Sequence, residues 1–158
     1  MTTAAHRSSL PPHLAAQAAE YVARLGPPDP VVVHADLTLN HAYVDEHGRL
    51  VGLIDWGDML VADRHLEIIQ VYRDMFRCEQ ELLRIFLEAA AWPPVDDFPR
   101  QALGMALHRQ AVGLAQHDTI DVFMPIAERF PLRDIPTLDD LAAALFAPWC
   151  RGTRGSRE

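Results

Sequence analysis

The sequence predicts an α+β fold that is mainly α-helical, with a small β-hairpin element embedded in a helical body. The β part is predicted by a β-branched run at residues 31–33 and by two short apolar segments, 42–45 and 49–54, on either side of a turn. The helical part is predicted by apolar side chains that recur every three or four positions from residue 65 onward.

Proline and glycine delimit the elements in the first third of the chain. A helix is expected over residues 13–25, between two proline-rich stretches. Residues 31–33 predict a buried strand that enters a loop at His34. The hairpin turn is Glu46-His47-Gly48, with glycine where a positive φ is expected. The loops that follow these strands are expected to leave one small sheet and to meet at one rim.

Further helices are expected in the rest of the chain, over residues 65–76, 79–91, 99–116, about 120–130, and 137–147. Thr137 is predicted to cap the last of these, because Asp139 and Asp140 follow it and acidic residues in a first turn favour the helix dipole. We expect a flexible N-terminus at 1–10, one folded domain at 11–147 and a flexible polar tail at 148–158.

Composition excludes several classes of function. The 158 residues carry a formal net charge of −8, which disfavours binding to nucleic acid or to an anionic membrane surface. No run of 18 apolar residues predicts a membrane-spanning helix, and the first residues do not resemble a signal peptide. Cys78 and Cys150 lack metal-ligand spacing, so both are expected to be free thiols in a cytoplasmic protein.

The stretch 31–58 carries the chemistry. Asp36 and Asn40 lie four positions apart in one loop, and Asp55 follows the predicted hairpin. Two carboxylates and an amide at one rim could hold a divalent cation and orient a hydroxyl group. Phosphoryl transfer from ATP requires a protein to supply such positioning and charge neutralisation.

These residues stand in a recognisable order. The pattern His34-Ala35-Asp36-x3-Asn40, followed by Ile54-Asp55-Trp56-Gly57-Asp58, resembles the aminoglycoside phosphotransferase family of kinase-like enzymes. The apolar strand before the first motif and the hairpin between the two motifs also match in order. The resemblance implies that residues 11–147 form the helical, C-terminal lobe of a kinase-like fold.

The resemblance also implies roles for single residues. Asp36 matches the catalytic aspartate, which takes or orients the proton of the attacking hydroxyl. Asn40 and Asp55 match the ligands of Mg²⁺ in a site for ATP or another nucleoside triphosphate. His34 and Asp58 are expected to support the loop. The substrate implied is a small molecule with a hydroxyl group, and Asp96, Asp97, Asp118 and Asp121 would suit a cationic one.

The chain departs from the family pattern at three places. Ala35 replaces the usual glycine, and Arg64 replaces a proline. Glu67 stands where an aspartate usually braces the catalytic loop, and a longer acid could still reach it. The chain has no lysine, so the lysine that pairs with ATP phosphates in the sheet-rich N-terminal lobe of such kinases is missing.

Three interpretations follow. The first is a small-molecule kinase, or its catalytic half, whose nucleotide lobe is missing from this chain. The second is a catalytically inactive lobe that acts as a binding or interaction domain, with an exposed patch that pairs with a homodimer partner or another lobe. The third is a metal-dependent hydrolase built from His34, Asp36, His41 and Asp55, which would prefer zinc or manganese. The Asp-x3-Asn spacing favours the kinase.

Overall fold

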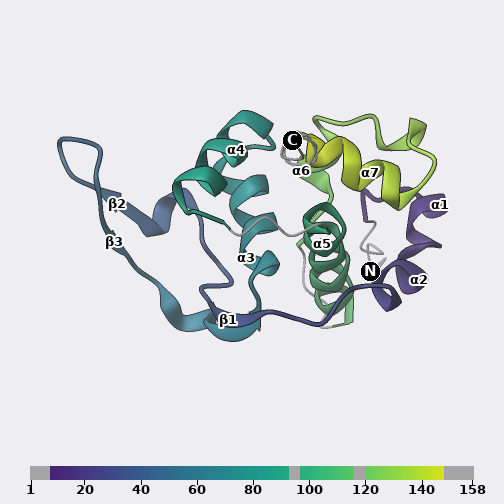
Figure 1. The fold of residues 1–158 in the computed structure, drawn as a ribbon, viewed down its shortest axis with the longest axis horizontal. Coiled ribbons are helices and arrows are strands. Elements are labelled where there is room, and N and C mark those ends of the chain that lie inside the picture. The colour runs from purple at the N-terminus through teal and green to yellow at the C-terminus, as the bar shows by residue number, and fades with distance from the viewer. Residues whose placement is uncertain (1–7, 93–96, 116–119, 148–158) are drawn as a thin grey trace, which may run out of the picture.

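A computed structural model describes residues 8–92, 97–115 and 120–147. The predicted flexible tail lies outside these ranges, as do residues 1–7 of the predicted flexible start. The predicted class is confirmed, since the molecule is an α+β protein dominated by helices (Figure 1). No described helix is long and apolar enough to cross a membrane.

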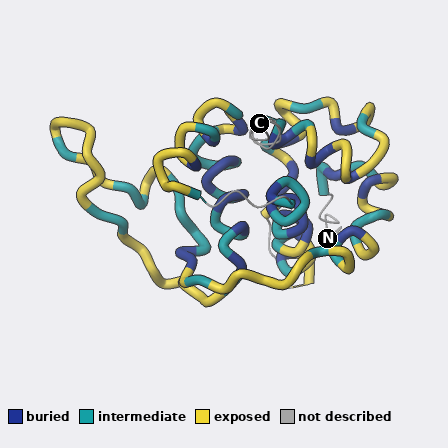
Figure 2. The backbone as a smooth tube through the Cα atoms, in the orientation of Figure 1, coloured by how far each residue is buried: buried dark blue, intermediate teal, exposed yellow. Residues whose placement is uncertain are grey.

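The core is built around the long helix α5 (Phe98–Ala115). One side of α5 packs against α3 (His65–Gln70), and other contacts join it to α2 (Ala18–Ala23) and α7 (Leu138–Leu145). Buried residues follow the inner faces of these helices (Figure 2). Burial of this apolar surface is what holds the helices together.

Shorter elements complete the helical body. They are α1 (Pro12–Ala15), the π-helical segment η3 (Val71–Met75), α4 (Gln80–Ala89), α6 (Met124–Ala127) and the 3₁₀ turn η4 (Leu132–Asp134). The predicted cap of α7 is confirmed, because the Thr137 side chain accepts a hydrogen bond from the Asp140 backbone N–H at 3.1 Å. Cys78 is a free, buried thiol, and Cys150 lies outside the described residues.

The β part consists of two separate antiparallel pairs, so the prediction of one small sheet was wrong. β1 (Pro30–Val33) pairs with β4 (Leu60–Asp63), and β2 (Ala42–Val44) pairs with β3 (Leu50–Leu53). The second pair is the predicted hairpin, which projects away from the helices (Figure 1). β4 was not predicted, because four residues give too short a pattern.

β1 is not a buried strand, which corrects a second expectation. Only Val33 is buried, and Val32 is 65% exposed. A two-stranded antiparallel pair that packs on the body with one face leaves its other face in solvent. A run of three valines therefore does not need two covered faces.

The start of the folded domain lies earlier than predicted. Leu10 is buried in the hydrophobic core, and the Ser9 backbone N–H donates to the Asp121 carboxylate at 2.6 Å. These contacts hold residues that were expected to belong to a flexible terminus.

Candidate active site at the β1 and β3 loops

The loop that follows β1 is tied to the segment after β3 through the ring of His34. This ring is buried, and its Nε2 lies 2.8 Å from the Ile54 carbonyl oxygen. Because that oxygen can only accept, Nε2 carries the proton. Nδ1 then accepts from the Asp36 backbone N–H at 3.3 Å. Both ring nitrogens are thus engaged, so His34 has none left for a metal and the hydrolase interpretation loses a ligand.

Glu67, on α3, also holds this loop in place, through hydrogen bonds to its backbone. Its Oε2 accepts hydrogen bonds from the backbone N–H groups of His34 at 2.6 Å and of Ala35 at 3.1 Å. The longer acid therefore reaches the loop that an aspartate usually braces. Ala35 itself has φ 66°, in the left-handed region that favours glycine. This local reversal of the chain turns Asp36 toward the rim, which is the place where the loop after β1 meets the segment after β3.

Gln70 is a second support that the sequence did not reveal. Its amide lies between two backbone groups of the loop. With the amide nitrogen toward the Ala35 carbonyl oxygen at 2.8 Å, its oxygen accepts from the Leu37 N–H at 3.3 Å. Gln70 follows Glu67 by three positions, so the two share one face of α3. That spacing was the only signal available.

Asp36, His41 and Asp55 form one cluster at the rim. His41 Nδ1 lies 2.7 Å from the Asp36 carbonyl oxygen and 4.0 Å from its carboxylate, while Nε2 lies 3.7 Å from Asp55 Oδ2. Asp55 follows β3 with φ 64° and begins the 3₁₀ turn η2 (Trp56–Asp58). The loop and the hairpin end thus bring together two carboxylates 19 positions apart.

Asp55 is more exposed than its apolar neighbours suggested. Its side chain is 66% exposed, and Ile54 and Trp56 are exposed as well. The apolar residues on either side of Asp55 in the sequence are therefore no sign that its carboxylate is buried. Its position at an open rim suits a group that meets a ligand from solution.

The other predicted residues lie nearby in different settings. Asn40 is exposed in the 3₁₀ turn η1 (Leu39–His41), and no hydrogen bond within the described residues holds its amide. Asp58 makes no hydrogen bond or ion pair to the part of the chain that the structure describes. It lines a cavity instead, so its supporting role stays a prediction.

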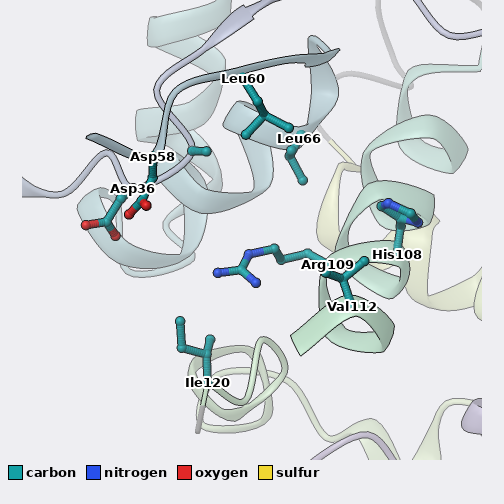
Figure 3. Close-up of a pocket in the computed structure, with 9 residues that line it drawn as sticks. Asp36, Asp58, Leu60, Leu66, His108, Arg109, Val112 and Ile120 are labelled. Carbon is teal, nitrogen blue, oxygen red and sulfur yellow. The ribbon is translucent and has the colours of Figure 1, made fainter. Parts of the chain in front are cut away.

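A cavity of about 600 Å³ opens beside Asp36. Asp36 and Asp58 lie at one end, and Arg109 of α5 extends into it from the opposite wall (Figure 3). Most of the remaining lining is apolar: Ala35, Leu60, Leu66, Val112 and Ile120, with His108 at the side. The cavity can take a small organic molecule whose polar groups face the carboxylates.

The acidic residues expected to favour a cationic substrate are placed elsewhere or not described. Asp97 pairs with Arg100 at 3.1 Å. Asp121 accepts hydrogen bonds from the backbone N–H groups of Ser9 and Phe123. Asp96 and Asp118 lie outside the described residues. Asp58 is the carboxylate that lines the cavity together with Asp36.

The carboxylate of Asp63 holds together the chain segments that precede β1 and follow β4. Asp63, at the end of β4, accepts hydrogen bonds from the Asp29 N–H at 2.9 Å and from the His65 N–H at 2.8 Å, and its Oδ1 lies 2.7 Å from the His65 ring nitrogen. Burial alone would raise the pKa of Asp63, but these hydrogen bonds outweigh it and hold the pKa below its ordinary value.

The donor set at the rim fits a hard cation that carries its own ligands. Among residues 8–92, 97–115 and 120–147, no group of three or more His, Cys, Asp or Glu side chains could enclose a metal ion. Mg²⁺ does not need such a cage, since it is usually bound by one or two carboxylates together with water and substrate phosphates. The exposed Asp55 carboxylate is suited to this kind of site.

The fold and the rim define a class: a small, mainly helical α+β protein that presents two carboxylates on loops beside a cavity. The sequence model of the phosphotransferase enzyme family matches residues 2–100, and the chain belongs to this family. Membership implies phosphotransferase activity in general, and kinases of the family generally use ATP and Mg²⁺. No solved structure matches the chain.

Proposed function

We propose that this chain is the catalytic, C-terminal lobe of a small-molecule kinase that transfers the γ-phosphoryl group of ATP, or of another nucleoside triphosphate, to a hydroxyl group. One observation carries the proposal: Asp36 stands between a cavity on one side and the His41–Asp55 cluster on the other. A base in this place can meet an acceptor from the cavity and a metal-bound phosphate from the rim.

Each group has a defined task in the proposed reaction. The acceptor hydroxyl oxygen bonds to the γ-phosphorus while the bond from that phosphorus to the β–γ bridging oxygen breaks. The hydroxyl proton passes to the Asp36 carboxylate, and ADP leaves. Bound Mg²⁺ would neutralise charge on the phosphates. Asp55 is its carboxylate ligand, and Asn40 is the second ligand that the sequence motif suggests.

The loop supports serve this reaction by holding Asp36. His34 fixes its backbone N–H, while Glu67 and Gln70 hold the residues on either side of it. A general base must lie within hydrogen-bonding reach of its proton, so small errors in loop position are costly.

The cavity supports a small acceptor with an apolar part and a hydroxyl group. Asp58 lies next to Asp36 and could hold a cationic or hydroxyl-rich group, which keeps aminoglycosides among the candidate acceptors (Figure 3). Leu60, Val112 and Ile120, which also line the cavity, favour an apolar portion of the acceptor.

The remaining half of the nucleotide site would come from a second, sheet-rich lobe that supplies a cationic phosphate clamp. Among the residues that the structure describes, more than half of the exposed large apolar side chains lie in residues 32–61, including Val32, Val51 and Val61. Exposed apolar surface of this kind marks an interaction site. We place the nucleotide lobe there; a second copy of the chain is the alternative occupant.

Phosphorus NMR tests the proposal directly. ATP, Mg²⁺ and the chain are incubated with a panel of hydroxyl compounds that includes aminoglycosides, choline, amino-acid alcohols and sugars. We expect ADP and a new phosphomonoester signal with one acceptor class. We expect Asp36→Asn to slow its formation by about 10²–10⁴-fold. Glu46→Gln, which changes an exposed carboxylate in the hairpin turn, is the control.

Two outcomes would contradict the kinase proposal. One is a phosphomonoester signal that forms equally fast with Asp36→Asn. The other is the lack of any product with every acceptor in the panel, which would favour the interaction-domain interpretation.

A further inference from the structure

We propose that His41, through its ring Nε2, is the second protein ligand of the metal held by Asp55, in place of Asn40. This inference rests on the proposed function, because it concerns the same metal. It assigns the ligand from the geometry of the rim rather than from the spacing of the motif.

The hydrogen bond at the other ring nitrogen sets the tautomer of His41. Nδ1 lies 2.7 Å from the Asp36 carbonyl oxygen, which can only accept. Nδ1 therefore carries the proton, and in the neutral ring Nε2 presents a lone pair. A histidine that binds a metal usually donates its other ring N–H to a carbonyl or carboxylate in this way.

The lone pair on Nε2 faces a second acceptor. Asp55 Oδ2 lies 3.7 Å away, which is longer than a hydrogen bond between nitrogen and oxygen. Two facing acceptors repel each other unless a cation lies between them. The separation is shorter than two metal–ligand distances of roughly 2.0–2.2 Å laid end to end, so one ion can contact both atoms.

Packing fixes the direction of the ring. The His41 ring stacks on the His34 ring with centroids 5.6 Å apart, and the Trp56 ring packs against His34 with centroids 4.7 Å apart. The His41 backbone is also bound, because its carbonyl oxygen accepts from the Ile54 N–H at 3.0 Å. The side chain is only 16% exposed. Asn40, in contrast, is exposed and has no comparable support.

An imidazole ligand changes the metal preference that the site should show. Mg²⁺ is a hard cation that prefers oxygen ligands. Mn²⁺ also binds oxygen ligands but, as a transition-metal ion, accepts an imidazole nitrogen more readily than Mg²⁺ does. We therefore expect this rim to favour Mn²⁺ over Mg²⁺ more strongly than a rim with an amide in the same place.

The test measures Mn²⁺ binding to the purified chain without nucleotide, from the electron paramagnetic resonance signal of free Mn²⁺. We expect His41→Ala to weaken binding about tenfold or more. We expect Asn40→Ala, and the control His47→Ala on the exposed hairpin turn, to leave it unchanged. His41→Asn tests selectivity: it should lower the ratio of Mn²⁺ to Mg²⁺ affinity. Circular dichroism checks that each variant is folded.

The outcomes separate this inference from the proposed function. If Asp55→Ala abolishes Mn²⁺ binding and His41→Ala does not weaken it, the metal site stands and the role of His41 is overturned. Loss of binding in Asn40→Ala alone would overturn it as well. Absence of Mn²⁺ binding in the original chain would also overturn this inference, and if Asp55→Ala binds Mn²⁺ as tightly as the original chain, the metal site of the proposed function fails too.

Discussion

Two residues at the rim hold backbone conformations that are costly for side chains other than glycine. Ala35 has φ 66° and Asp55 has φ 64°. A short polar side chain such as aspartate tolerates this region better than alanine does. The strain at Ala35 is held by the Glu67 and Gln70 hydrogen bonds on either side of it.

Ala35→Gly should therefore stabilise the protein. Relief of the left-handed conformation is worth about 1–2 kcal/mol, and the greater freedom of glycine in the unfolded chain offsets about 0.5–1 kcal/mol of it. We expect a net gain of up to about 1.5 kcal/mol in the free energy of unfolding, measured by urea denaturation. Ala62→Gly in β4 is the matched control and should destabilise. A loss of stability in Ala35→Gly would contradict the inference that the Ala35 backbone is strained.

Asp63 should make stability depend on pH in the acid range. Hydrogen bonds hold its folded-state pKa below the unfolded value of about 3.9. A group with a lowered folded-state pKa contributes stability that is present above the unfolded pKa and is lost as pH falls through the folded pKa. The difference in unfolding free energy between the original chain and Asp63→Asn should shrink as pH falls below about 4. A difference that stays constant down to pH 2 would contradict this.

Single residues also show where sequence reasoning ends. The reach of Glu67 to the loop could be expected, because the position in the motif marked it as a brace. Gln70 could not, because a glutamine on a helix has no chemical pattern that distinguishes a loop contact from a solvated side chain. His41 was expected as a ligand only in the hydrolase interpretation, and its contacts with Asp36 and Asp55 could not be predicted because these lie on two different loops.

At the scale of elements, most helices and the β2–β3 hairpin were predictable, and the pairing of β1 with β4 was not. Apolar side chains recur along one face of α4 and of α7, Thr137 caps the start of α7, and Pro99 stands in the first turn of α5. β1 and β4 are four residues each and find each other across 26 intervening positions. Their pairing depends on the route of the chain through η2, which no local pattern encodes.

The cap of α7 allows a prediction at this scale. Thr137→Ala removes the acceptor for the Asp140 N–H and should cost about 1 kcal/mol of stability. Thr38 precedes η1 in the same extended conformation but makes no capping hydrogen bond, so Thr38→Ala is the matched control. Thermal denaturation of both variants measures the difference. Equal losses would show that the Thr137 cap contributes nothing specific.

In the molecule as a whole, the residues that stabilise the fold and the residues of the candidate active site lie in different parts. The helices around α5 form the core, and the hairpin and loops extend from it with most of their side chains in solvent (Figure 2). Substitutions at Asp36 and Asp55 remove exposed or half-exposed carboxylates, so they should leave the fold intact. Their effects on binding can therefore be measured on a folded protein.

The central claim is that Asp55 binds the metal–nucleotide complex while Asp36 acts on the acceptor. Calorimetric titration of the chain with Mg–ATP tests it most directly, in the original protein and in Asp55→Ala and Asp36→Asn. We predict binding in the original chain, loss of binding in Asp55→Ala, and retention in Asp36→Asn. No binding heat from the original chain, or binding that survives Asp55→Ala, would contradict the account.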